Sequence, residues 1–249
     1  MKKILITCLL LQMVATAFSQ EEAPAEIYFE VHDIYREAVS QADLKTAATL
    51  TDVYERYPAS WVKEYVSVEV IATCDGVEKR AMGIDDQLNE AQKKVLKMAD
   101  YDSKIKIDIS YIPDNTLTHN DVQKHEIVLP VLAESEASFP GGAEKMAAYF
   151  KESIVAKIPE STVIEEVAWT AVRFTIDRDG TIGKITASGS TQSEAIDQSI
   201  MDAICGMPKW TPAVDSKGEK VAQELEFMLG NTAKICGLNL YLIEGYFLD

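Results

Sequence analysis

The chain has 249 residues, of which 47% are hydrophobic, and its 40 acidic side chains outnumber 24 basic ones to give a net charge of −16. Such an acidic chain repels phosphate backbones, so nucleic acid is excluded as an expected partner. The length and the ordinary apolar content predict a folded protein with one large domain or two small ones.

Residues 1–19 are predicted to be a cleaved signal peptide. A basic start at Lys2 and Lys3 is followed by an apolar run over residues 4–18, and Ala17 and Ser19 are small residues at the −3 and −1 positions of a cut before Gln20. A retained membrane anchor is the alternative, but a spanning helix needs about 20 apolar residues. Cleavage near Ser19/Gln20 removes both lysines. It leaves 249 less 19, or 230, residues with a net charge of −18, in an exported protein.

Residues 20–60 are predicted to be a helical segment that forms an N-terminal helical hairpin, because apolar side chains recur in it at helical spacing. The first helix would carry Ile27, Val31, Ile34, Tyr35 and Ala38, and the second Leu44, Ala47, Ala48, Leu50, Val53 and Tyr54. Pro58 would end the second helix.

Residues 61–132 are predicted to form a first α+β unit. Residues 64–74 alternate as a strand, Asp75-Gly76 supplies a tight hairpin turn, and residues 77–82 return as a second strand. A helix capped by Asp85 or Asp86 follows, then a strand over 105–111 and another over 127–131.

The second half of the chain repeats this order of elements. Strands are predicted over 168–176 and 182–188 around the Asp179-Gly180 turn. A helix opened by a capping box from Thr191 to Glu194 runs to Met207, where Pro208 stops it, and a closing strand covers 221–229. The fold class predicted is α+β, with two tandem strand-strand-helix-strand units and antiparallel sheets. Chance recurrence of a common arrangement is the alternative.

The sequence contains no recognisable arrangement of catalytic residues. The three histidines lie on different segments without metal-ligand spacing, and no phosphate-binding or dinucleotide motif is present. We therefore expect no enzyme, no cofactor, no metal and no small-molecule substrate. Of the cysteines beyond the signal, Cys74 suits a buried strand position, and Cys205 and Cys236 are the pair to test for a disulfide, since spacing alone cannot place them within bridging distance.

Four segments of the second half together resemble one family. They are Phe139-Pro140-Gly141-Gly142, the hairpin from Val172 to Gly180, the segment from Met207 to Ala213, and Gly218 to Phe227. Residues 139–230 are similar to the TonB C-terminal domain in the form with an FPGG and an MPKWxPA motif. The motif residues have a mainly structural interpretation: Phe139, Pro140, Gly141, Gly142, Asp179, Gly180, Met207, Pro208, Lys209, Trp210 and Pro212.

The resemblance implies a non-catalytic, periplasmic protein-binding module. Members of the family recognise an extended peptide of an outer-membrane receptor or other envelope protein, paired to the final strand of the domain. Such strand addition uses the unpaired backbone groups of an open edge. The matching edge-strand residues here are Gly218, Lys220, Val221, Gln223, Leu225, Phe227 and Leu229. The acidic residues of this segment favour a neutral or basic peptide.

Two departures from the family shape the functional hypothesis. The transducing members keep a membrane anchor and a proline-rich spacer, so energy transduction by this chain alone is not expected, although a link to TonB-dependent transmembrane transport stays open. The C-terminal tail 231–249 carries alternating Leu238, Leu240 and Leu242 and is predicted to add a strand that closes the binding edge. The alternative function is a structural or assembly protein of the cell envelope.

Overall fold

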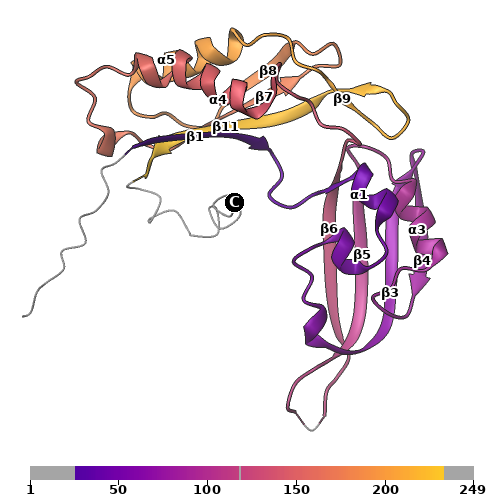
Figure 1. Ribbon diagram of the computed structural model, residues 1–249. Coiled ribbons are helices and arrows are strands. Elements are labelled where there is room, and N and C mark those ends of the chain that lie inside the picture. Colours follow the sequence, from indigo (N-terminus) through magenta and orange to yellow (C-terminus); the bar gives the residue numbers. More distant parts are fainter. Residues whose placement is uncertain (1–25, 118, 233–249) are drawn as a thin grey trace, which may run out of the picture.

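The computed structural model describes residues 26–117 and 119–232, which form an α+β protein with two larger sheets and one separate two-stranded hairpin (Figure 1). The helices are α1 (Gln41–Thr46), α2 (Leu50–Val53), α3 (Glu90–Lys97), α4 (Gly142–Ser153) and α5 (Glu194–Cys205), with short 3-10 turns η1 (Ala59–Trp61), η2 (Val155–Lys157) and η3 (Ile164–Glu166). The strands are β1 (Ile27–Asp33), β2 (Val39–Ser40), β3 (Val62–Cys74), β4 (Val77–Gly83), β5 (Lys104–Pro113), β6 (Gln123–Leu132), β7 (Thr170–Ile176), β8 (Ile182–Ala187), β9 (Ala213–Val214), β10 (Lys220–Val221) and β11 (Gln223–Asn231). No helix among the described residues is long and apolar enough to cross a membrane.

The N-terminal sheet has the strand order β2-β6-β5-β3-β4, and its pairings are antiparallel except for the short parallel contact of β2 with β6. The strands predicted at 64–74, 77–82, 105–111 and 127–131 are thus confirmed within β3, β4, β5 and β6. Their alternating apolar side chains bury one face, where α1, α2 and α3 pack, whereas the other face carries ion pairs such as Lys106 with Glu126.

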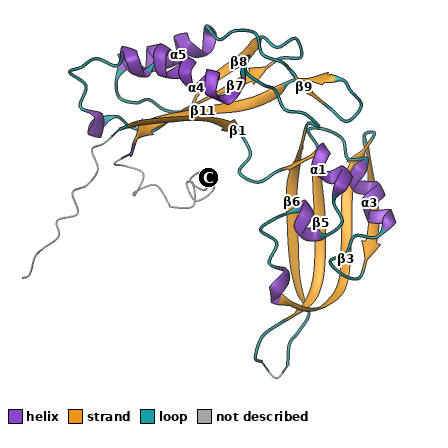
Figure 2. Ribbon diagram, in the orientation of Figure 1, coloured by secondary structure: helices purple, strands orange, loops and turns teal. Residues whose placement is uncertain are grey.

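The C-terminal sheet has the strand order β1-β11-β7-β8, and α4 and α5 cover one of its faces (Figure 2). The hairpin of β7 and β8, the helix α5 ending before Pro208 and the closing strand are the elements expected from the sequence. The largest of its fully buried side chains are Phe150 from α4, Phe174 from β7 and Phe227 from β11. This packing of helices on one face of an antiparallel sheet is the α+β architecture that was expected.

The predicted first helix of the N-terminal hairpin is wrong. Residues 27–33 form the strand β1, which pairs antiparallel with β11 along seven consecutive residues, from Ile27 opposite Asn231 to Asp33 opposite Leu225. Ile27, Phe29 and Val31 alternate towards the core, a strand period that competes with the helical one in the same segment. Pairing with a distant strand decides the conformation, and only the short helices α1 and α2 remain of the hairpin.

Two predicted helix starts and one strand boundary are also corrected. Asn89, not Asp85 or Asp86, caps α3, and it forms a capping box with Gln92. The predicted capping box of α5 is absent, because the Thr191 hydroxyl donates to the Asp197 carboxylate at 2.7 Å instead of capping the helix. The closing strand begins at Gln223, since Val221 belongs to the separate β9–β10 hairpin.

The β9–β10 hairpin joins the two halves of the molecule. Its turn reaches the end of the N-terminal sheet, where Lys217 Nζ lies 2.9 Å from Asp75 Oδ1 and 3.5 Å from Asp100 Oδ1. The buried amide of Gln41 bridges both halves, because its Nε2 donates to the Ala99 carbonyl at 2.8 Å and its Oε1 accepts from the Ser216 N–H at 2.9 Å. These polar contacts lie beside a small apolar cluster, in which Ala133 and Tyr101 of the N-terminal half pack with Ala213 and Val221 of the hairpin.

Candidate strand-addition site

The candidate site is the long edge of β11 that faces away from β7. Four of the predicted partner-binding residues, Gln223, Leu225, Phe227 and Leu229, lie on β11 and are buried, with their side chains in the core. The other three do not join them. Gly218 lies in the turn of the β9–β10 hairpin, and Lys220 and Val221 pair with Val214 and Ala213 in β9 and β10.

The edge of β11 is already occupied by a strand of the same chain. β11 lies between β7 and β1, so it is an interior strand in this structure and not an edge (Figure 1). The predicted closure of this edge by the tail falls on residues 233–249, which lie outside the described residues, as does Cys236. Cys205 is an exposed free thiol. The segment 27–33 provides the closing strand.

Aromatic packing anchors the middle of β1. The Phe29 ring lies with its centroid 6.3 Å from that of Phe227 in a stacked arrangement and 6.2 Å from that of Phe150. Phe150 and Phe227 themselves have centroids 4.8 Å apart. Ring pairs at such spacings add to the burial of apolar surface. Phe29 therefore anchors β1 on the core of the C-terminal sheet.

Hydrogen bonds tie down both ends of β1. At its start, the Thr232 N–H donates to the Glu26 carbonyl at 2.8 Å, and the Glu26 N–H donates to Thr232 Oγ1 at 2.9 Å. At its end, Gln223 Nε2 donates to Asp33 Oδ2 at 3.2 Å, while Gln223 Oε1 accepts from the Ala137 N–H at 2.7 Å. The buried Gln223 side chain thus links β1 to the connection that leads into α4.

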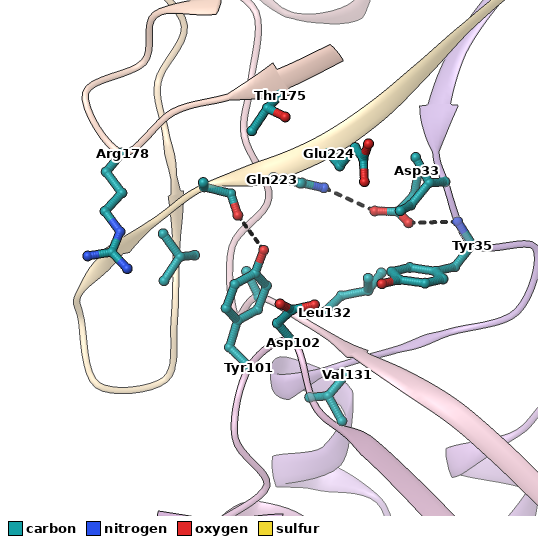
Figure 3. A pocket seen from close by; sticks show the side chains of 14 residues that line it. Asp33, Tyr35, Tyr101, Asp102, Val131, Leu132, Thr175, Arg178, Gln223 and Glu224 are labelled. Atoms are coloured by element: carbon teal, nitrogen blue, oxygen red, sulfur yellow. Dashed lines mark hydrogen bonds between the residues drawn. The ribbon is translucent and has the colours of Figure 1, made fainter. Parts of the chain in front are cut away.

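A cavity of about 410 Å³ opens at the Asp33 end of β1, between the two sheets (Figure 3). β1 and the segment after it contribute Asp33 and Tyr35, β11 contributes Glu224, and the connection from α3 to β5 contributes Tyr101 and Asp102. The Tyr101 hydroxyl donates to the Ala222 carbonyl. The cavity has a mixed lining of aliphatic side chains, three carboxylates and two phenols, and Arg178 lies at its opposite side in the view of Figure 3.

The potential in this cavity is negative. Burial raises the pKa of Tyr101 to about 12, and the charges of Asp102 and Asp33 add to the rise. The pKa of Tyr35 is also raised, first by burial and then by Asp102, Asp33 and Glu224. The pKa of Glu136, an exposed residue, is raised first by partial desolvation and then by the charge of Asp33. Each shift disfavours a further negative charge at this place.

The family motifs pack together beside the sheet rather than in the site. The Phe139 and Trp210 rings meet edge to face with centroids 5.4 Å apart, and the Trp210 N–H donates to the Gly180 carbonyl at 2.9 Å. Lys209 lies 3.9 Å from Asp179, and Gly141 and Gly142 adopt positive φ at the start of α4. Met207 is buried, and Pro208 and Pro212 flank Trp210 along the chain. These contacts support the structural interpretation of the motif residues.

Sequence reasoning missed the β1 residues and the cavity. The alternation of Ile27, Phe29 and Val31 was a usable signal for a strand, but it competed with a helical pattern over the same residues. Nothing in the sequence indicated that Asp33, Asp102 and Glu224, separated by tens of residues, share one cavity. No cluster of three or more metal-ligating side chains occurs within 26–117 and 119–232.

The fold and the site thus describe an α+β protein whose last strand pairs with β1, and one segment of the chain is similar to a known family. Residues 144–229 match the family model described as TonB C terminal. Domains of this family are associated with the periplasm and the cell envelope, interact with proteins such as outer-membrane receptors, and do not form an enzyme family. No curated protein and no solved structure matched the chain. The matched segment runs from α4 into β11 and does not include β1.

Proposed function

We propose that this chain is a non-catalytic, periplasmic protein-binding module, exported by a cleaved signal, which takes an extended segment of a partner protein as an added strand on β11. The partner proposed is an outer-membrane receptor or another envelope protein, and the partner strand replaces β1. This proposal joins the match to the TonB C-terminal family with the geometry of the last strand.

The observation that carries the proposal is the pairing of β1 with β11. β1 lies outside the family match, and about 190 residues separate it from β11, as in the contact of Asp33 with Gln223. It nevertheless forms a regular antiparallel ladder with β11 and contributes an aromatic anchor. An edge that accepts this remote strand has the backbone groups and the side-chain pockets that strand addition requires.

Exchange of β1 for a partner strand is physically reasonable. No residue of β1 is fully buried, whereas β11 is buried at every second position. A replacing strand would re-form the same ladder of backbone hydrogen bonds, so the exchange conserves them. The tether of residues 34–38 gives β1 a high effective concentration, which lowers the apparent affinity of any competitor.

Binding of a synthetic peptide that covers residues 26–34 would test the site directly. We expect the peptide to bind the mature protein weakly, and to bind a Phe29→Ala variant at least about tenfold more tightly, because truncating the cis anchor weakens its hold by about 2 kcal/mol. Fluorescence anisotropy of a labelled peptide gives both affinities. Peptides from the N-termini of outer-membrane receptors would then be titrated against the same variant.

A Val70→Ala variant is the matched control, because Val70 is buried in the N-terminal sheet and does not touch β1. This change should lower stability without improving peptide binding. If the Phe29→Ala variant shows no saturable binding of the 26–34 peptide, strand exchange at β11 is not the function of this site.

The second candidate is a structural or assembly protein of the cell envelope, in which two tandem units join larger proteins. It is favoured by the strand orders, because the two sheets share one arrangement. In β4-β3-β5 and in β8-β7-β11, the first strand of a hairpin lies between its return strand and the strand that follows the helix. Affinity capture after crosslinking in cells separates the two candidates. Receptors are expected for strand exchange, and other envelope components are expected for a scaffold.

A further inference from the structure

The strand site on β11 ends in an acidic cavity, and the strand that now occupies it carries an acid at that end. Asp33 is the last residue of β1, and its carboxylate accepts from Gln223 Nε2 and, at 3.0 Å, from the Tyr35 N–H. Asp33 and Glu224 both line this cavity (Figure 3). Asp102 lines the same cavity from the connection between α3 and β5.

The charges around Asp33 are mostly of its own sign. Asp102, Glu224 and the nearby Glu136 are acidic, while Arg178, the one basic side chain lining the cavity among the described residues, lies at its opposite side (Figure 3). Like charges in a partly buried cavity repel each other more strongly than in water. The Asp33 carboxylate is held among side chains of its own sign by the two hydrogen bonds that it accepts from Gln223 Nε2 and the Tyr35 N–H.

We propose that the partner strand carries a lysine or arginine at the position that Asp33 occupies in β1. This inference rests on the proposed function, because it names the chemistry of the segment that replaces β1. A basic side chain there would lie among the carboxylates of Asp102 and Glu224. Its apolar stem would run along the rings of Tyr35 and Tyr101, and aromatic faces also attract cations.

The charge difference would give the site its selectivity between cis and trans strands. The two strands share the backbone ladder, so discrimination has to come from side chains. The repulsion between Asp33 and the acids of the cavity is offset by its two hydrogen bonds, whereas a base at that position would be attracted to Asp102 and Glu224. A partner with a basic residue can thereby compete with a tethered strand.

Three peptides compared on the Phe29→Ala variant of the mature protein test this inference. They are the 26–34 sequence, the same peptide with Asp33→Lys, and a control with Glu26→Lys, which changes the peptide charge equally at the other end of the strand. We expect Asp33→Lys to tighten binding by about tenfold, and Glu26→Lys to tighten it far less, because only position 33 meets the cavity.

Removing the acids of the cavity should reverse this ranking. In a protein that also carries Asp102→Asn and Glu224→Gln, the Asp33→Lys peptide should lose most of its advantage, and the unsubstituted peptide should bind more tightly than before. Equal gains from both lysine peptides, or a gain that survives removal of the acids, would overturn the inference while leaving strand exchange intact. If none of the three peptides binds, strand exchange itself is overturned.

A measurement in cis probes the same site without any exchange of strands. Asp33→Lys in the full chain should slow amide hydrogen exchange across Tyr28 to His32 by about tenfold, because the β1 end is then attracted to the cavity. Faster or unchanged exchange would show that the cavity does not favour a base at this position. This readout separates a failure of the charge preference from a failure of peptide binding.

Discussion

Gly180 lies where two of the family motifs touch, which makes it a sharp test of the structural role of those motifs. Its φ is +86°, and a side chain there would overlap the backbone carbonyl of Trp210. The backbone N–H of the same Trp210 donates a hydrogen bond to the Gly180 carbonyl. We expect Gly180→Ala to lower the free energy of unfolding by about 2–4 kcal/mol, since strain and overlap add. Thermal or urea unfolding measures this loss.

Gly218 provides the matched control for this substitution. It has a similar φ of +81°, but a Cβ added there meets nothing within 4 Å. Gly218→Ala should therefore cost only the backbone strain, about 1 kcal/mol. Equal losses for the two variants would mean that the contact of the hairpin turn with the Trp210 segment does not contribute.

At the scale of elements, β1 is the part of the fold whose mobility determines the proposed function. Glu30 and Met228 are direct antiparallel partners, so cysteines at these positions should form a disulfide that fixes β1 to β11. In a Phe29→Ala protein with Cys205 and Cys236 replaced by serine, oxidation of this pair should weaken binding of the 26–34 peptide by more than about tenfold. Reduction should restore binding.

A second disulfide with the same Met228→Cys change is the control for this experiment. Ala171 is the partner of Met228 on β7, and cysteines there would join β11 to β7 without touching β1. Peptide binding should be similar in its oxidised and reduced forms. Binding that persists when β1 is fixed to β11 would place the peptide elsewhere on the protein.

The elements show what the sequence can predict and where it stops. The β3–β4 turn at Asp75-Gly76 was predictable, because both residues take the positive φ that a tight hairpin needs, and alternation identified β3, β5 and β7. β1 was not predictable, because its seven residues fit both a helical and a strand pattern of apolar side chains. Only the pairing with β11 decides between helix and strand. The cavity depends on that same long-range pairing and was therefore also beyond local patterns.

At the scale of the whole molecule, the ion pairs of Lys217 are one of the contacts that join the two sheets, beside the apolar cluster of Ala133, Ala213 and Val221. We expect Lys217→Glu, which places an acid against Asp75 and Asp100, to broaden the distribution of distances between fluorescent labels on the two sheets. Lys209→Glu makes the same charge change within the C-terminal half and should not alter the distribution. Identical distributions for both variants would contradict this role.

The same contact should weaken in acid. The hydrogen bond and charge of Lys217 hold the pKa of Asp75 below its ordinary value. The folded protein therefore gains from the ionised carboxylate above the ordinary range of aspartate, and this gain disappears as the pH falls through the lowered pKa. The label distances should broaden in that acidic range in the wild-type protein, and less so in Lys217→Glu.

The ladder between β1 and β11 also sets the order in which the protein can fold. β1 is made early, but its partner strand follows about 190 residues later, whereas the N-terminal sheet pairs only segments between residues 39 and 132. Contacts so distant in sequence form slowly, and a chain emerging from its N-terminus folds its early parts first. Until β11 arrives, β1 is an unpaired apolar strand. The newly emerged chain therefore passes through a stage in which chaperones or other strands compete for the segment that later completes its last sheet.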